Sequence, residues 1–269
     1  METVLEVKDL CVTYQNKSRS VYAVKDVSFS INQGDSLGIV GESGSGKSTL
    51  AMAILRLLPP KTAQVTGEAY FQGKELLTLD DASLREIRWK HLAVVFQKAM
   101  NALSPVHRIS TQIEDIYRQH EPKATRQEIR QRSQELFQMV GLPDRVYRLY
   151  PHEMSGGMLQ RVAIAISLLH SPQLLIFDEA TTALDVVTQG QILEEVVRLE
   201  KALNTTRIMI THDMSVVSAS CTKTAVMYAG QMMEIGQTRD VLKRPMHPYT
   251  QGLLRSFPTL TGERKTLES

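Results

Sequence analysis

The chain has 269 residues, of which 42% are hydrophobic and 22% charged, so it can bury a substantial core in one elaborated domain or two small ones. Its 31 basic and 29 acidic residues nearly cancel to a net charge of +2, which gives no argument for binding nucleic acid or an anionic membrane surface. Its 2 cysteines, Cys11 and Cys221, are too few for a disulfide framework or a metal cluster, and we expect both in or near the core. No stretch approaches the roughly 18 consecutive apolar residues of a membrane span, and the charged N-terminus does not resemble a signal peptide.

The first part of the chain combines alternating and continuous apolar patterns. Alternation predicts half-buried strands at residues 4–14 and 22–31. Short apolar runs predict further strands at 37–40, 65–71 and 92–96. Helices are expected at 50–58, which is stopped by Pro59 and Pro60, and at 83–90 with Ser83 as its N-cap.

Residues 99–170 differ from the preceding part of the chain in their apolar pattern. They have helical periodicity at 109–118, 125–140 and 157–169 and no clear strand pattern. Beyond them, strands are predicted at 174–177, 207–210, 224–228 and 232–235, and helices at 187–203 and 214–220. This alternation predicts a largely parallel sheet covered on both faces, with an inserted helical part. The tail from residue 244 is punctuated by prolines, so we expect His247 to be a turn residue and the end to fray.

A glycine-rich segment follows the predicted strand at 37–40. It fits the phosphate-loop pattern G-x-x-x-x-G-K-[ST] and consists of Gly41, Glu42, Ser43, Gly44, Ser45, Gly46, Lys47, Ser48 and Thr49. Its glycines let backbone N–H groups turn inward around an anion, and the helix that follows adds its positive N-terminal end. We expect Lys47 to reach the outer phosphates of a nucleotide and Ser48 to bind Mg²⁺. The alternative is a strand-to-helix turn that binds nothing.

Two carboxylates, Asp178 and Glu179, come directly after the apolar strand at 174–177. Beside a phosphate loop, Asp178 is expected to orient Mg²⁺ and Glu179 to polarise the attacking water. Taken alone, the pair could equally be turn residues.

The segment at residues 154–161 reads MSGGMLQR and precedes a predicted helix. Ser155, Gly156 and Gly157 would form a second anion-facing surface at that helix N-terminus, although Ser-Gly-Gly alone could be only an N-cap. The segment resembles the signature motif of ABC-type ATPases, usually written L-S-G-G-Q.

Other residues match the ABC set in the family's order. Tyr14 is similar to the aromatic residue that stacks on adenine, and Gln97 to the glutamine that senses the metal. Asp185 belongs to a segment that matches the family's loop after the two carboxylates. His212 matches the family's switch histidine. The resemblance implies a P-loop NTPase (ABC ATPase) of the α/β class with a mostly parallel sheet, an N-terminal antiparallel β-subdomain and an inserted α-helical subdomain.

The resemblance also implies a mechanism and a division of the chain. Two ATPase subunits would face each other head to tail, with ATP and Mg²⁺ between one phosphate loop and the other subunit's signature helix. Glu179 would act as general base and His212 as a γ-phosphate clamp. The ATP-binding domain would span residues 1–243, with the helical subdomain at about 99–170 contacting membrane subunits, and a short tail would span 244–269.

A narrower resemblance, to the peptide/nickel import group of bacterial ABC ATPases, comes from residues 151–158 (PHEMSGGM) and 244–250 (RPMHPYT). It implies a second, different ATPase subunit, two permeases and an extracytoplasmic substrate-binding protein, no nucleic acid, and a peripheral location on the cytoplasmic side of the cell membrane. Met158 and Ala180 depart from the commonest family residues. The short tail without a cysteine-bearing extension favours nickel or metal-chelate cargo over oligo- or dipeptides, and argues against an iron–sulfur cluster.

Two other readings are possible for a chain with this loop. A soluble, non-transport ABC ATPase acting on ribosomes or DNA usually has tandem cassettes or long coiled-coil or zinc insertions, which this sequence lacks. A small-molecule kinase does not explain residues 155–161 or His212. We therefore expect an ATP-hydrolysing subunit of an importer.

Overall fold

The computed structural model describes residues 2–16, 19–96, 103–180 and 186–256. Its centre is a six-stranded sheet in the order β10-β9-β3-β8-β7-β6. The strands are β3 (Ser36–Val40), β6 (Leu92–Phe96), β7 (Leu174–Asp178), β8 (Thr206–Thr211), β9 (Lys223–Tyr228) and β10 (Gln231–Gln237). All neighbours are parallel except β9 and β10, so the carboxyl ends of β3, β7 and β8 meet at one edge.

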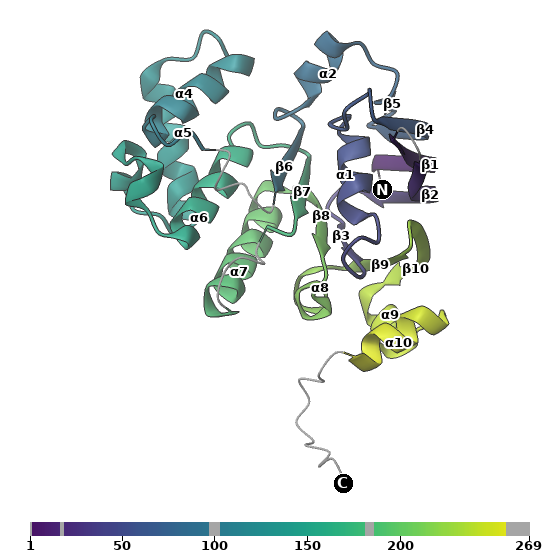
Figure 1. Ribbon diagram of the computed structural model, residues 1–269. Helices are drawn as coiled ribbons and strands as arrows, with labels where there is room; N and C mark the ends of the chain where they lie inside the picture. The colour runs from purple at the N-terminus through teal and green to yellow at the C-terminus, as the bar shows by residue number, and fades with distance from the viewer. Residues whose placement is uncertain (1, 17–18, 97–102, 181–185, 257–269) are drawn as a thin grey trace, which may run out of the picture.

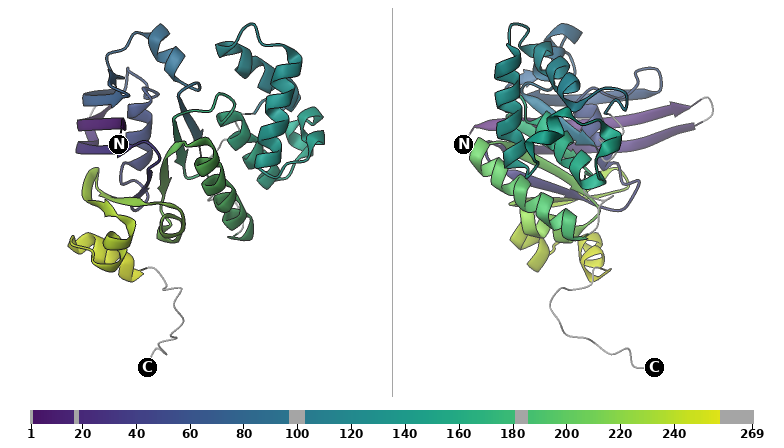
Figure 2. Two further views of the ribbon diagram at one scale, coloured as in Figure 1. Left: turned by 180° about the vertical axis from the view of Figure 1, so that it is seen from behind. Right: turned by 90° about the vertical axis from the view of Figure 1, so that its left-hand side faces the viewer.

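A second, antiparallel sheet of four strands has the order β2-β1-β4-β5. It contains β1 (Thr3–Asn16), β2 (Arg19–Asn32), β4 (Ala63–Phe71) and β5 (Lys74–Glu75). The far ends of β1 and β2 extend beyond the rest of the molecule (Figure 2, right). This is the antiparallel N-terminal part that the family resemblance implies.

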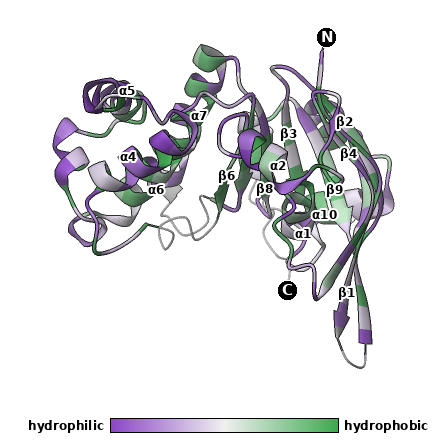
Figure 3. Cartoon of the chain, turned by 90° about the horizontal axis from the view of Figure 1, so that it is seen from above, coloured by the Kyte–Doolittle hydropathy of each residue, from purple (hydrophilic) through white to green (hydrophobic). Residues whose placement is uncertain are grey.

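Three longer helices, α4 (Ile109–His120), α5 (Arg126–Met139) and α6 (Gly156–Ser167), lie between β6 and β7 in the chain and form a group on one side of the central sheet (Figure 1). Short 3₁₀ helices at Asp144–Arg148 and Pro151–Glu153 connect α5 to α6. Hydrophilic residues dominate α5 at the outer edge of this group (Figure 3). The predicted α/β fold with an inserted helical part is confirmed, whereas the exact division at residues 99, 170 and 243 stays a prediction.

The remaining helices cover the sheet or follow it. They are α1 (Lys47–Ile54), α2 (Asp81–Ile87), α7 (Val186–Leu203), α8 (Met214–Ser220), α9 (Thr238–Lys243) and α10 (Pro248–Ser256). Among the described residues, no helix combines the length and the apolar character that crossing a membrane requires.

The core lies on both faces of the central sheet, as strand β7 shows. Leu174 and Ile176 pack in the hydrophobic cluster that contains α1, whereas Leu175 and Phe177 pack in the cluster that contains α6 and α7. This alternation follows from the two-residue period of a strand buried on both faces. The helices α1 and α6 therefore lie on opposite faces of the sheet.

The boundaries of α1 differ from the prediction of 50–58. The helix begins at Lys47 and ends at Ile54, because Arg56 takes a left-handed conformation with φ 51°. The N–H of Leu57 donates to the carbonyl of Met52 (2.8 Å), which closes a Schellman-type C-terminus before the prolines.

One further local prediction was wrong. The N-cap of α2 is Asp80 rather than Ser83, since Asp80 Oδ1 accepts hydrogen bonds from the N–H groups of Ala82 and Ser83, both at 2.9 Å. The tail contains the helix α10, which the sequence patterns did not predict. His247 lies in a bend directly before it, as expected for a turn residue, and its Nδ1 accepts from the N–H of Tyr249 (3.1 Å). Short polar helices such as this one have little periodicity for a sequence pattern to detect.

Candidate active site

The glycine-rich loop joins β3 to α1 and is packed tightly against backbone from two other strands. A Cβ added at Gly41 would lie 2.1 Å from the carbonyl oxygen of Met227, and one at Gly46 would lie 2.3 Å from that of Ala23. Gly46 also has φ 102°, a conformation that favours glycine. The loop therefore needs glycine at both positions, whereas Gly44 (φ 79°) lies at the exposed tip beside Ser43.

The side chain of Lys47 lies inside the curve of the loop and is only 4% exposed. Its Nζ donates to the carbonyl oxygens of Gly41 (2.8 Å) and Glu42 (2.7 Å) and to Ser45 Oγ (3.2 Å). Burial lowers the pKa of Lys47, while the carboxylates of Glu179 and Asp178 act in the opposite direction. The loop thus holds one ammonium group at the centre of a ring of backbone groups.

Ser48 and Asp178 meet although 130 residues separate them in the chain. Ser48 Oγ donates to Asp178 Oδ1 at 2.7 Å, and Asp178 ends β7 with 5% of its surface exposed. Burial raises the pKa of Asp178, an effect that the hydrogen bond from Ser48 partly offsets. Hydroxyl and carboxylate oxygens are ligands that Mg²⁺ prefers, and a divalent cation would stabilise this buried carboxylate, so the donor set fits that metal.

Glu179 and His212 come together because β7 and β8 are parallel neighbours. The N–H of Glu179 donates to the carbonyl of Ile210 (2.9 Å), and Glu179 Oε1 lies 3.6 Å from His212 Nδ1. Glu179 has φ 50°, which turns the chain at the end of the strand. The side chain of His212 is 57% exposed, so it borders the site from the solvent side.

The other candidate residues have different placements. Tyr14 on β1 lies with its hydroxyl 3.4 Å from Thr49 Oγ1, beside the first turn of α1. Gln97 and Asp185 lie outside the described residues. The site therefore brings together the phosphate loop, both carboxylates, His212 and Tyr14.

The signature segment forms the N-terminus of α6. Ser155 is the N-cap, and its Oγ accepts a hydrogen bond from the N–H of Met158 (3.4 Å). Gly156 is exposed, and a Cβ on Gly157 would come within 3.1 Å of the Thr188 methyl group on α7. Because α6 and α1 pack on opposite faces of the central sheet, the helix that begins at this segment and the helix that follows the phosphate loop are separated by the sheet (Figure 1).

The model of the ABC transporter family matches residues 24–182, more than half of the chain. The chain belongs to the ABC transporter family. A second model, the oligopeptide/dipeptide transporter C-terminal region, matches residues 233–269 of this ABC cassette. Family membership makes ATP the nucleotide expected at the phosphate loop.

Curated relatives include oligopeptide transport ATP-binding protein OppD of Bacillus subtilis (strain 168), 44% identical over 267 residues that cover 97% of this chain and 74% of the relative. OppD of Escherichia coli (strain K12) is 43% identical over 268 residues, or 99% of this chain and 79% of the relative. Dipeptide transport ATP-binding protein DppD of Bacillus subtilis (strain 168) is 43% identical over 263 residues, or 97% and 78% of the two chains.

Two solved structures are similar in fold. The dimeric, post-hydrolysis state of the ATP-binding cassette MJ0796 bound to ADP and Pi has a TM-score of 0.78 and 30% identity, and the match covers 87% of this chain and 99% of that chain. The structure of cbiO1 from Clostridium perfringens, part of the ABC transporter complex cbiONQ, has a TM-score of 0.75 and 28% identity over 91% and 92% of the two chains.

The sequence did not predict that the backbone of a later turn hydrogen-bonds to the phosphate loop. The N–H of Gly230, in the turn between β9 and β10, donates to the carbonyl of Ser45 (3.0 Å), and its own carbonyl accepts from the N–H of Lys25 (2.8 Å). The sequence marks Gly230 as a turn residue, but no pattern links that turn to a loop more than 180 residues earlier.

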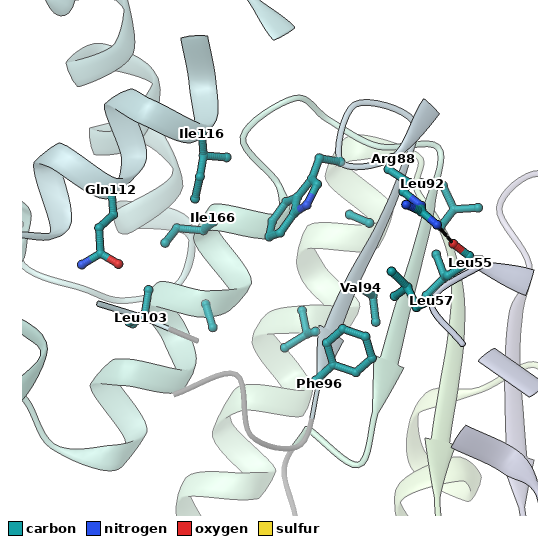
Figure 4. A pocket seen from close by; sticks show the side chains of 14 residues that line it. Leu55, Leu57, Arg88, Leu92, Val94, Phe96, Leu103, Gln112, Ile116 and Ile166 are labelled. Carbon is teal, nitrogen blue, oxygen red and sulfur yellow. Dashed lines mark hydrogen bonds between the residues drawn. The ribbon is translucent and has the colours of Figure 1, made fainter. Parts of the chain in front are cut away.

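An apolar cavity of about 310 Å³ lies between the edge strand β6 and the helical group (Figure 4). Val94 and Phe96 line it from the strand, and Leu103, Ile116 and Ile166 line it from the helical side. This cavity adjoins the chain just before Gln97, at the entry to the helical insertion.

Proposed function

We propose that this ABC cassette is the ATP-hydrolysing subunit of an importer for oligo- or dipeptides. The observation that carries the proposal is the convergence of Lys47, Ser48, Asp178, Glu179 and His212 at the carboxyl edge of parallel strands. The cargo is inferred from the names of the curated relatives and from the C-terminal match. The short tail predicted nickel or metal chelates as cargo in preference to peptides, and none of the relatives named above supports that prediction.

In the proposed reaction, the loop N–H groups from Gly41 to Thr49 surround the phosphates and Lys47 exchanges its carbonyl partners for phosphate oxygens. Ser48 and Asp178 would hold Mg²⁺, which would neutralise phosphate charge, and Gln97 is assigned to the same ion. Glu179 accepts the proton of the attacking water and His212 contacts the γ-phosphate from the exposed side. Tyr14 stacks on the adenine ring.

The cassette MJ0796, which is similar in fold, is dimeric in its state bound to ADP and Pi, and this supports a site completed by another chain. In this proposal Ser155, Gly156 and Gly157 contact the γ-phosphate of the nucleotide held by a second ATPase subunit, a different paralogue. Asp185 is assigned to the nucleotide site by the family resemblance. ATP closes the pair and hydrolysis reopens it, so the chemistry drives a conformational cycle.

The membrane partners of the proposed importer are two permease subunits, and an extracytoplasmic binding protein delivers the cargo. We infer that a permease segment contacts the apolar cavity beside β6, since Trp89 at its rim is 40% exposed. The subunit would then be peripheral, on the cytoplasmic side of the cell membrane.

The test is Glu179→Gln in the assembled transporter. ATP affinity should change by less than about twofold, while ATP turnover should fall about 10²–10⁴-fold, the usual contribution of a general base. Glu121→Gln, at an exposed carboxylate paired with Lys90, is the matched control and should hydrolyse ATP normally. Normal turnover in Glu179→Gln would refute the assignment of the base, and co-purification with permeases unrelated to peptide import would refute the cargo.

A further inference from the structure

The C-terminal helix α10 is anchored at its first turn. The carboxylate of Glu234 on β10 accepts hydrogen bonds from the N–H groups of Met246 (2.9 Å) and His247 (3.1 Å). His247 Nδ1 in turn accepts from the N–H of Tyr249 (3.1 Å), and Thr250 is fully buried. These contacts fix the position of the Tyr249 side chain relative to the central sheet.

The ring of Tyr249 packs on Tyr228, with the ring centroids 4.4 Å apart and the planes 38° from parallel. Tyr228 ends β9 directly before the turn whose Gly230 N–H donates to Ser45 in the phosphate loop. Its neighbour Met227 supplies the carbonyl against which Gly41 packs. Tyr249 therefore packs against the end of β9, the segment whose backbone contacts the phosphate loop.

The hydroxyl of Tyr249 is close enough to Glu42 of the loop to interact with it. It is buried, and it has no hydrogen bond of normal geometry among the described residues. Burial and the neighbouring Glu42 carboxylate raise the pKa of Tyr249. Glu42 is also the residue whose carbonyl accepts a hydrogen bond from Lys47 Nζ (2.7 Å). A small movement of Glu42 would complete a hydrogen bond to this hydroxyl. Such a movement is favourable, because a buried hydroxyl without a hydrogen-bond partner destabilises the fold.

We propose that Tyr249 is a positioning residue for the phosphate loop. Its ring on Tyr228 supports the loop from behind, and its hydroxyl restrains Glu42 and thereby Lys47. The inference rests on the proposed function, since it takes the loop as the ATP site. It gives the C-terminal segment a role in nucleotide affinity, and by thermodynamic reciprocity ATP must in turn stabilise the docking of α10.

The experiment measures ATP binding by titration calorimetry and thermal unfolding for the full-length chain. Tyr249→Phe keeps the stack and should weaken ATP binding about 3- to 5-fold, as expected for one hydrogen bond. Tyr249→Ala removes both contacts and should weaken it by about 10-fold or more. Tyr70→Phe is the matched control, because it removes a tyrosine hydroxyl that donates to a glutamate on β4 (Glu68, 3.0 Å); its ATP affinity should equal that of the unmodified chain.

Two further measurements separate positioning from a purely structural role. In the assembled transporter, Tyr249→Phe should raise the KM for ATP while kcat changes less than about twofold, because the affected interaction belongs to binding. ATP should slow hydrogen exchange across residues 248–256, and Tyr249→Ala should abolish that protection.

An unchanged ATP affinity in both Tyr249 variants, or a lowered melting temperature with unchanged affinity, would overturn the inference while leaving the proposed function intact. Failure of the unmodified chain to bind ATP would instead overturn the proposed function.

Discussion

Replacing His170 should reduce the acid sensitivity of the folded chain. The ring follows α6 and lies against Tyr117 (centroids 4.8 Å apart) and His120 (5.1 Å) of α4. Its Nε2 is buried and unpaired among the described residues. Burial, and next the neighbouring His120, lower the pKa of His170 to about 4, although the Ile116 carbonyl and Glu121 oppose the shift and Lys90 adds to it.

The sign of the effect follows from which state binds the proton first. The unfolded chain protonates near the ordinary pKa of 6.5, but the folded chain does so only near 4, so acid favours unfolding. The difference of 6.5 − 4 = 2.5 units corresponds to about 3 kcal/mol once the pH is below both values. Between pH 7 and pH 5 the loss from this residue is about 2 kcal/mol.

Urea unfolding of the purified chain between pH 7 and pH 5 measures this loss. His170→Phe, which cannot be protonated, should flatten the pH dependence of the unfolding free energy by about 2 kcal/mol over that range. His152→Gln, at an exposed histidine, is the control and should retain the full slope. An identical slope in His170→Phe and the unmodified chain would show that His170 does not stay neutral in the folded state.

Three other substitutions test the site and its surroundings. Gly46→Ala should abolish ATP binding in a calorimetric titration without unfolding the chain, because the new Cβ would collide with the Ala23 carbonyl; measurable binding would refute that packing. Lys47→Ala should raise the Kd for ATP at least about 10-fold, and unchanged affinity would contradict the central place of the ammonium. Arg161→Leu should lower the unfolding free energy by about 3 kcal/mol in urea, because it leaves the half-buried Glu195 (2.5 Å from Arg161) without its partner; a loss below about 1 kcal/mol would mean that solvent replaces the pair.

Much of the fold follows from local patterns. Strong signals, such as the apolar run of β7 and the G-x-x-x-x-G-K-[ST] loop, depend on neighbouring residues only, so the sequence alone predicts them correctly. Local geometry was predicted less well. The N-cap of α2 at Asp80 and the end of α1 at Ile54 were misplaced, because caps depend on which of several adjacent polar groups reaches the free N–H and C=O groups.

By itself, the sequence determined the fold class, the family resemblance and the chemical types of the site residues, since motifs are short-range patterns of required side chains. Only the tertiary structure decided which of them meet. It placed Ser48 against Asp178 and Glu179 beside His212, because parallel strands bring their carboxyl ends to one edge. It also put the signature helix α6 on the opposite face of the sheet from α1, and it docked Tyr249 on Tyr228, because burial of apolar faces joins segments that no local pattern connects.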